Sequence, residues 1–192
     1  MNAFSFYFPM GWEHIISKDA LDHQLFIIAL AALYTWSDWK KVLVLVTAFT
    51  IGHSVTLLLS VLDWIRLDSQ WVEFLIPLTI MITAALNLFQ LNQKQTTSIS
   101  TYGLALFFGF IHGMGFANSI RFMLAQDQQI GWGLFGFNVG LEVGQMLVVV
   151  LLLCINHFVT FIAKLPAHKW NFIISCLVLG IAFGITMNRY PF

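Results

Sequence analysis

Histidine and carboxylate side chains lie within apolar stretches of this sequence, where ionisable groups are rare and costly, and just before the first of these stretches. The candidates are His14, Asp22, His23, His53, His112 and Glu142. Imidazole and carboxylate groups can ligate a transition metal or pass a proton along a chain of partners. These six residues are therefore the candidate metal ligands, and Glu142 is a ligand or a general base if the protein is an enzyme.

The acids need something to neutralise them, and the apolar stretches contain no lysine or arginine placed to do so. Either the carboxylates are protonated and form a relay with the histidines, or they hold a metal cation. We favour the cation. Nitrogen and oxygen donors without cysteine suit Ni, Co, Zn, Cu(II) or Fe(II). Cys154 and Cys176 lie in apolar runs without a CxxC spacing, as small hydrophobic residues do.

The composition is that of a membrane protein. Of 192 residues, 59% are hydrophobic and 9% are charged, and the mean hydropathy is +0.82. A soluble domain carries about 25% charged residues, so the chain is expected to be integral to a lipid bilayer. A net charge of zero without a basic patch argues against nucleic-acid binding.

Six stretches approach the length of about 20 apolar residues that a membrane helix needs. They are roughly 20–37, 41–62, 72–91, 101–124, 131–155 and 169–188, preceded by a short amphipathic segment at 4–18. The predicted fold is all-α, a polytopic membrane bundle forming a single domain over 1–192. We expect no cleavable signal peptide, because no basic region precedes the first span.

Basic residues in the connecting segments predict the orientation. Lys40, Lys41, Lys94, Lys164 and Lys169 fall in the odd-numbered loops, against Lys18, Arg66, Arg121 and Arg189 on the other side. Positive charge accumulates on the cytoplasmic side. Both termini are therefore expected on the outer, periplasmic side of a bacterial inner membrane.

Polar residues and glycines recur at helical spacing within the spans. The residues expected to support the ligands or line a polar path are Asp19, Thr50, Thr56, Asn138 and Gln145, and Thr79, Thr83 and Asn87 form a stripe on the third span. Two GxxxG series, Gly109–Gly113 and Gly136–Gly140–Gly144, predict close helix contacts for spans four and five. The inner halves of the spans offer little polarity beyond Thr47, Asn87 and Gln90.

The deep ionisable residues are predicted to meet at one level of the bundle. With a rise of about 1.5 Å per residue, His53 lies roughly 13 Å, Glu142 roughly 16 Å and His112 roughly 18 Å from the outer ends of their spans. Asp22 and His23 stand where the first span begins, with His14 just upstream. They are expected to lie above this cluster or to join it.

Four blocks of the chain resemble the HupE/UreJ membrane proteins. They are GWEHIISKDALDHQLF (11–26), FTIGHSVTLLLS (49–60), FFGFIHGMGFA (107–117) and FNVGLEVGQ (137–145). The resemblance implies a six-helix inner-membrane protein of the kind associated with nickel or cobalt entry for hydrogenase or urease. The family's histidine-rich motif of the first helix maps onto His14, Asp22 and His23. The spacing between its first histidine and the Asp-His pair is longer here than in nickel permeases, so the identity of the metal stays open.

Three functions remain for such a site. The leading hypothesis is a nickel/cobalt-type permease that captures a divalent ion at the outer face and holds it in transit. The alternative is an intramembrane metalloenzyme that retains one or two ions, and a further possibility is a metal-dependent assembly factor for another membrane complex. The expected partners are the lipid bilayer and the metal ion, with a homo-oligomer or a larger membrane complex also conceivable.

Overall fold

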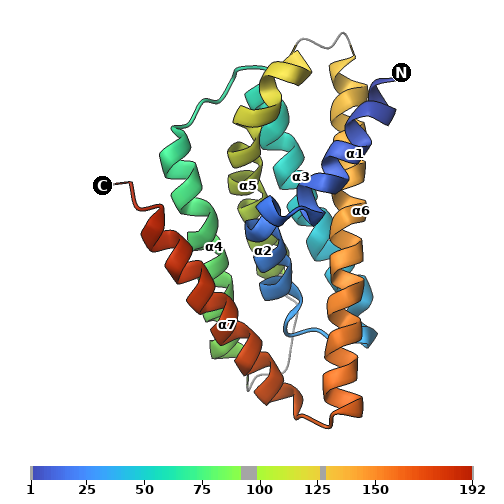
Figure 1. Ribbon diagram of the computed structural model, residues 1–192, viewed down its shortest axis with the longest axis vertical. Coiled ribbons are helices and arrows are strands. Elements are labelled where there is room, and N and C mark those ends of the chain that lie inside the picture. Colours follow the sequence, from blue (N-terminus) through green and yellow to red (C-terminus); the bar gives the residue numbers. More distant parts are fainter. Residues whose placement is uncertain (1, 92–98, 126–128, 192) are drawn as a thin grey trace.

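The described part of the chain is a bundle of helices (Figure 1). A computed structural model describes residues 2–91, 99–125 and 129–191. Its helices are α1 (Ala3–Ile16), α2 (Leu21–Ala31), α3 (Trp39–Val61), α4 (Ser69–Gln90), α5 (Ile99–Ala125), α6 (Ile130–His157) and α7 (Ala167–Asn188). Short 3-10 turns at Lys18–Ala20 and Trp36–Asp38 precede α2 and α3, and a π-helical turn, Phe158–Ile162, extends α6. The predicted all-α fold is confirmed.

The helices are long and apolar enough for a membrane protein. Four of them, Trp36–Val61, Ser69–Gln90, Ile130–Ile162 and Ala167–Asn188, could each cross a bilayer, and Leu21–Ala31 and Thr101–Ala117 are shorter apolar helices. Large apolar side chains point outward along them, as Phe89 at 78% exposure and Phe161 at 74% illustrate. Because such a surface suits lipid rather than water, the chain is an integral membrane protein, as the composition predicts.

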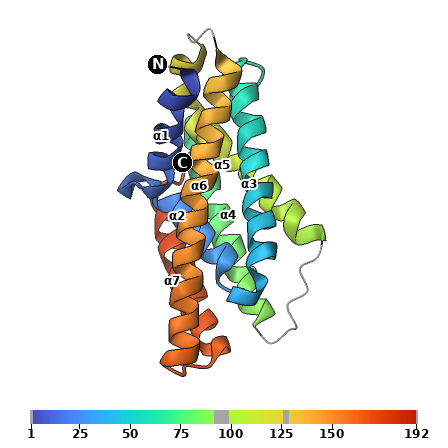
Figure 2. The same ribbon diagram turned by 90° about the vertical axis from the view of Figure 1, so that its right-hand side faces the viewer.

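The first predicted span is not one helix. In place of a helix over 20–37, α2 ends at Ala31, and the chain turns before the 3-10 turn that leads into α3. Thr35 and Asp38 form a reciprocal cap there: the Thr35 amide and hydroxyl both donate to Asp38 Oδ2, which starts the next helix early. The amino-terminal segment is the separate helix α1, and it packs along α6. Together α1 and α2 make one interrupted path down the bundle (Figures 1 and 2).

Glycines allow the closest helix contacts. A Cβ on Gly140 of α6 would collide with the carbonyl oxygen of Phe8 of α1, and one on Gly109 of α5 would collide with that of Phe49 of α3. Only glycine lets two backbones approach so closely. The GxxxG prediction for spans four and five is confirmed, and these two contacts set α1 against α6 and α3 against α5.

Both ends of α2 are held by amide side chains. Gln24 donates from Nε2 to the carbonyl oxygens of Ile15 and Ser17, 3.0 Å each, across the break from α1. At the other end, Asn87 of α4 donates to Ala29 O at 2.6 Å, and Asn156 of α6 donates to Tyr34 O at 2.6 Å. Carbonyls released at a helix end need such donors away from water. Asn87 therefore anchors α2, a role that its place in the polar stripe does not reveal.

Replacing Gln24 with alanine should lower the free energy of unfolding by about 1–3 kcal/mol, because it removes the side-chain donor of the Ile15 carbonyl and leaves the Ser17 carbonyl with the Ala20 amide alone. Thermal unfolding in detergent measures the change. Gln70→Ala is the control, since Gln70 is exposed at the start of α4. Equal unfolding temperatures for the two variants would contradict this account of the break.

Candidate metal centre

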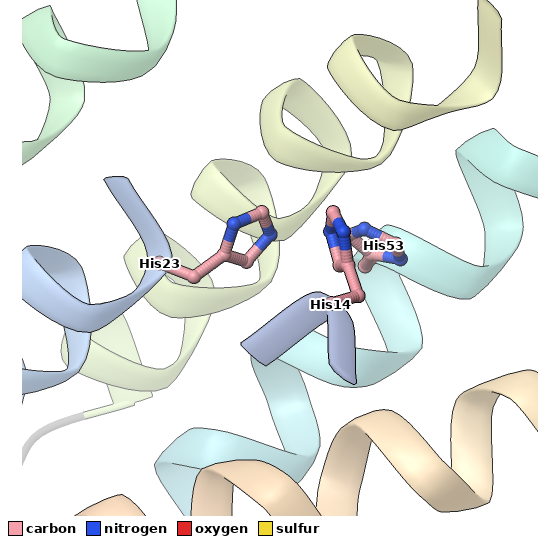
Figure 3. A group of neighbouring side chains, drawn as sticks. All are labelled: His14, His23 and His53. Atoms are coloured by element: carbon pink, nitrogen blue, oxygen red, sulfur yellow. The ribbon is translucent and has the colours of Figure 1, made fainter. Parts of the chain in front are cut away.

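Three histidines from three different helices meet inside the bundle. His14 lies in the last turn of α1, His23 in the first turn of α2 and His53 in the middle of α3. One ligand atom of each lies within 4.8 Å of those of the other two. Figure 3 shows the His23 ring directed at the rings of His14 and His53. The break between α1 and α2 brings His14 and His23 together, with 4.6 Å between their ring centroids, because α2 begins beside the end of α1. We call these three residues the histidine triad.

Several nitrogen atoms of the triad have no hydrogen-bond partner among the described residues. His53 is fully buried, and neither of its ring nitrogens has a hydrogen-bond partner. The Nε2 atoms of His14 and His23 are also buried without a partner. Each buried, unsatisfied polar group costs about 1–3 kcal/mol, and native structures keep few of them unless water or an ion is involved. A neutral imidazole carries one lone pair, so the three histidines can offer three lone pairs in one place, as a metal-binding site requires.

His112 of α5 lies next to the triad and is held by a threonine. Its ring centroid is 5.1 Å from that of His23, and its Nε2 is 3.3 Å from the Thr79 hydroxyl of α4. Because the Thr79 hydroxyl donates to Ile76 O at 2.7 Å, it accepts from His112 Nε2. The proton then resides on Nε2, and the buried, unpartnered Nδ1 carries a lone pair. Such a contact fixes the tautomer of a metal-ligating histidine.

Aromatic rings enclose the histidines. Phe116 of α5 lies 3.8 Å from His14 between ring centroids, and Phe137 of α6 lies 5.8 Å from His14 and 6.3 Å from His53. Phe49 of α3 lies 5.1 Å from His112 and 6.0 Å from His23. An apolar shell of this kind limits solvent access and strengthens electrostatic contacts at the centre.

The Glu142 carboxylate does not join the triad. Its Oε1 accepts a 2.7 Å hydrogen bond from Thr47 of α3, and Gln145 Oε1 similarly accepts one of 2.8 Å from Thr50. The reason is rotational: Phe137 takes the face of α6 toward the histidines, and Glu142, five residues on, is turned by about 140° from it. The Glu142 side chain therefore points to Thr47 of α3 and not into the triad.

Asp22 has a basic partner, contrary to the expectation that the acids lack one. Arg189, at the end of α7, donates from Nη1 to Asp22 Oδ2 at 2.8 Å, while Asp22 Oδ1 is buried without a partner. The charge of this carboxylate is therefore balanced within the protein. The sequence position of Arg189, after the last span, does not show that the end of α7 lies beside the start of α2.

The other residues that were predicted to support the ligands are Thr56, Asn138 and Asp19. The Thr56 hydroxyl donates to the carbonyls of Gly52 and His53 on its own helix, at 3.1 and 3.2 Å. Asn138 Oδ1 is buried without a partner, and the Asp19 side chain lies outside the described part of the chain. Sequence reasoning did not identify Thr79 as a partner of His112, nor the rings of Phe116 and Phe137. The sequence held two signals for these residues. Thr79 belongs to the polar stripe of the third span, and both phenylalanines lie in the blocks that resemble the family.

The donor set is nitrogen-rich and free of sulfur. Cys154 and Cys176 are exposed on the outside of the bundle, so thiolate ligation plays no part in the triad. Three imidazoles suit late divalent first-row metals, and their neutral form is the ligating one. The arrangement can therefore hold a transition-metal ion with positions left for other ligands.

Comparison with known proteins places the chain in a family. No curated protein and no solved structure matches it. A family model described as HupE / UreJ protein matches residues 1–189. This range includes the triad, His112 and nearly all of the chain. The chain belongs to the HupE/UreJ protein family.

Proposed function

We propose that the protein is a permease for a divalent transition-metal ion, of the nickel or cobalt type, and that the triad holds the ion in transit. The observation that carries this proposal is the meeting of three histidines whose buried nitrogens lack partners. The metal is the cargo of the protein. His14, His23 and His53 would be its ligands, and His112 would offer a fourth nitrogen beside them.

The architecture around the triad supports transit. Two of the three ligands flank the break between α1 and α2, and interrupted helices commonly form substrate sites in membrane transporters. Three protein ligands leave coordination positions that water or a further side chain can fill and vacate. Binding must be weak enough for release, and an incomplete ligand set meets that need better than a closed one.

Family association favours nickel or cobalt among the metals that imidazole suits. The ion would enter from the amino-terminal end of the bundle, where α1 starts (Figure 1). The predicted charge distribution makes that end periplasmic in a bacterial inner membrane. Asp22, adjacent to His23, would lie beside the ion at the triad, with its charge balanced by Arg189.

A metalloenzyme is the second candidate, since three histidines with an open position also occur in catalytic zinc sites. Such an enzyme needs a general base near the metal. Glu142 accepts a hydrogen bond from Thr47 instead. Among the described residues, the group of side chains close enough to share one ion consists of histidines and contains no carboxylate. The permease therefore fits the geometry better.

The test combines metal content with flux. Purified protein should hold about one Ni or Co ion per chain, lose it on dialysis against a chelator, and carry the same ion into liposomes loaded with a metal-sensitive dye. Stoichiometric metal that survives the chelator, without flux above empty liposomes, would overturn the permease in favour of an enzyme or assembly factor.

A further inference from the structure

A cavity with a partly polar lining lies between the histidine centre and the end of the bundle remote from the amino terminus. Its volume is about 70 Å³, which leaves room for several water molecules. It is lined by α2 and the residues that follow it, by α4 and by α5, and its polar lining residues are Tyr34, Thr83, Asn87, Gln90 and Thr101. Gln90 is exposed at the end of α4, so the polar lining reaches the edge of the protein.

A line of oxygen atoms on α4 joins this cavity to His112. Thr79 contacts His112, Thr83 lies one turn further along, and Asn87 and Gln90 continue the same face. The hydroxyls of Thr79 and Thr83 donate to the carbonyls of Ile76 and Thr79, so their free sites are oxygen lone pairs. Asn87 uses its amide nitrogen on Ala29 O, which leaves its oxygen as an acceptor. Lone pairs of oxygen suit a partly hydrated cation.

Aromatic side chains lie between the histidine centre and the cavity. Phe26 of α2 lies 5.3 Å from the ring of His112 and 5.8 Å from that of Phe108, and Phe108 lines the cavity. Phe26 and Phe108 are buried. His112 thus has the triad on one side, with its Nδ1 lone pair unpartnered, and the Phe26–Phe108 pair between it and the cavity on the other.

We propose that this cavity is the exit vestibule of the protein, and that a divalent cation passes from the triad through His112 and along the α4 oxygens into it. Phe26 and Phe108 form the closed gate. This inference rests on the proposed permease function. The α4 oxygens and the cavity together would form a polar route from the triad to the end of the bundle remote from the amino terminus. In the sequence, the residues of this route appear only as scattered polar positions.

Thr83→Val tests the route, because it removes the oxygen while keeping the shape of the side chain. The variant should bind Ni with the affinity of the wild type but carry it into liposomes about tenfold more slowly, since a contact to a charged group is worth at least that factor. Thr186→Val is the matched control: Thr186 is a buried threonine of α7 with the same bond to the carbonyl four residues before it, at 2.7 Å.

A second variant fills the space itself. Ala105 of α5 is buried and lines the cavity, so Ala105→Leu should also reduce flux and leave Ni binding unchanged. Wild-type flux in both Thr83→Val and Ala105→Leu would overturn the exit route while leaving the triad and the permease standing. A wild-type protein that binds Ni but shows no flux would overturn the permease and the route together.

Discussion

Replacing His53 with alanine should abolish stoichiometric metal binding. His53 is the most deeply enclosed member of the triad, with no exposed surface and no hydrogen-bond partner on either nitrogen. Removing it leaves two of the three ligands that lie within reach of one ion. Loss of second-shell partners already costs 10–100-fold in metal affinity, so we expect a loss of affinity greater than about 100-fold.

The same variant should remain folded. Alanine leaves a void beside Phe137, which destabilises the protein. It also removes two buried nitrogens without partners, each of which costs about 1–3 kcal/mol when unsatisfied. Because these effects oppose each other, the metal-free variant should unfold near the temperature of the metal-free wild type. Added Ni should raise the unfolding temperature of the wild type alone, since only the folded state with a site binds the ion.

Elemental analysis of the purified protein and thermal unfolding with and without Ni measure both results. His157→Ala is the matched control, because His157 is exposed at the end of α6 with its ring stacked 4.8 Å from Phe161. It should keep full metal content. A His53→Ala protein that retains one ion per chain with unchanged affinity would refute the triad as the site.

Local patterns predicted most of the helices and their closest contacts. Five of the six predicted spans match α3 to α7 closely, because long apolar runs with charged breaks report membrane helices directly. The glycine series predicted backbone contact correctly, since a GxxxG face leaves no side chain between helices. The membership of His14, His23 and His53 in one group of candidate ligands also followed from residue type alone.

What the sequence could not show depends on contacts between distant segments. The first span is divided because amide side chains satisfy the carbonyls at its ends. They are those of Gln24 of α2, Asn87 of α4 and Asn156 of α6. Asp22 and Arg189 are far apart in sequence, so their pairing follows only from the fold. Depth along a helix could be counted for Glu142, but the face that it occupies depends on how α6 rotates against α1.

Replacing Gly140 with valine should separate α1 from α6 and weaken metal binding without touching a ligand. A Cβ at this position would collide with the backbone carbonyl of Phe8, and a neighbouring contact of the same interface sets Gly11 against the carbonyl of Phe137. Overpacking that side chains can absorb costs about 1–3 kcal/mol. Backbone atoms cannot rotate away, so we expect a loss of about 3 kcal/mol or more in the free energy of unfolding.

The substitution should also lower the affinity for the metal, because α1 carries the ligand His14. Moving α1 away from α6 withdraws His14 from His23 and His53, so the affinity for Ni should fall at least about tenfold in protein that remains folded. Gly184→Val is the control, since a Cβ at Gly184 on α7 meets nothing within 4 Å. It should leave both the unfolding temperature and the affinity unchanged. If Gly140→Val binds Ni as tightly as Gly184→Val, His14 does not depend on the α1–α6 contact, and its place in the triad is wrong.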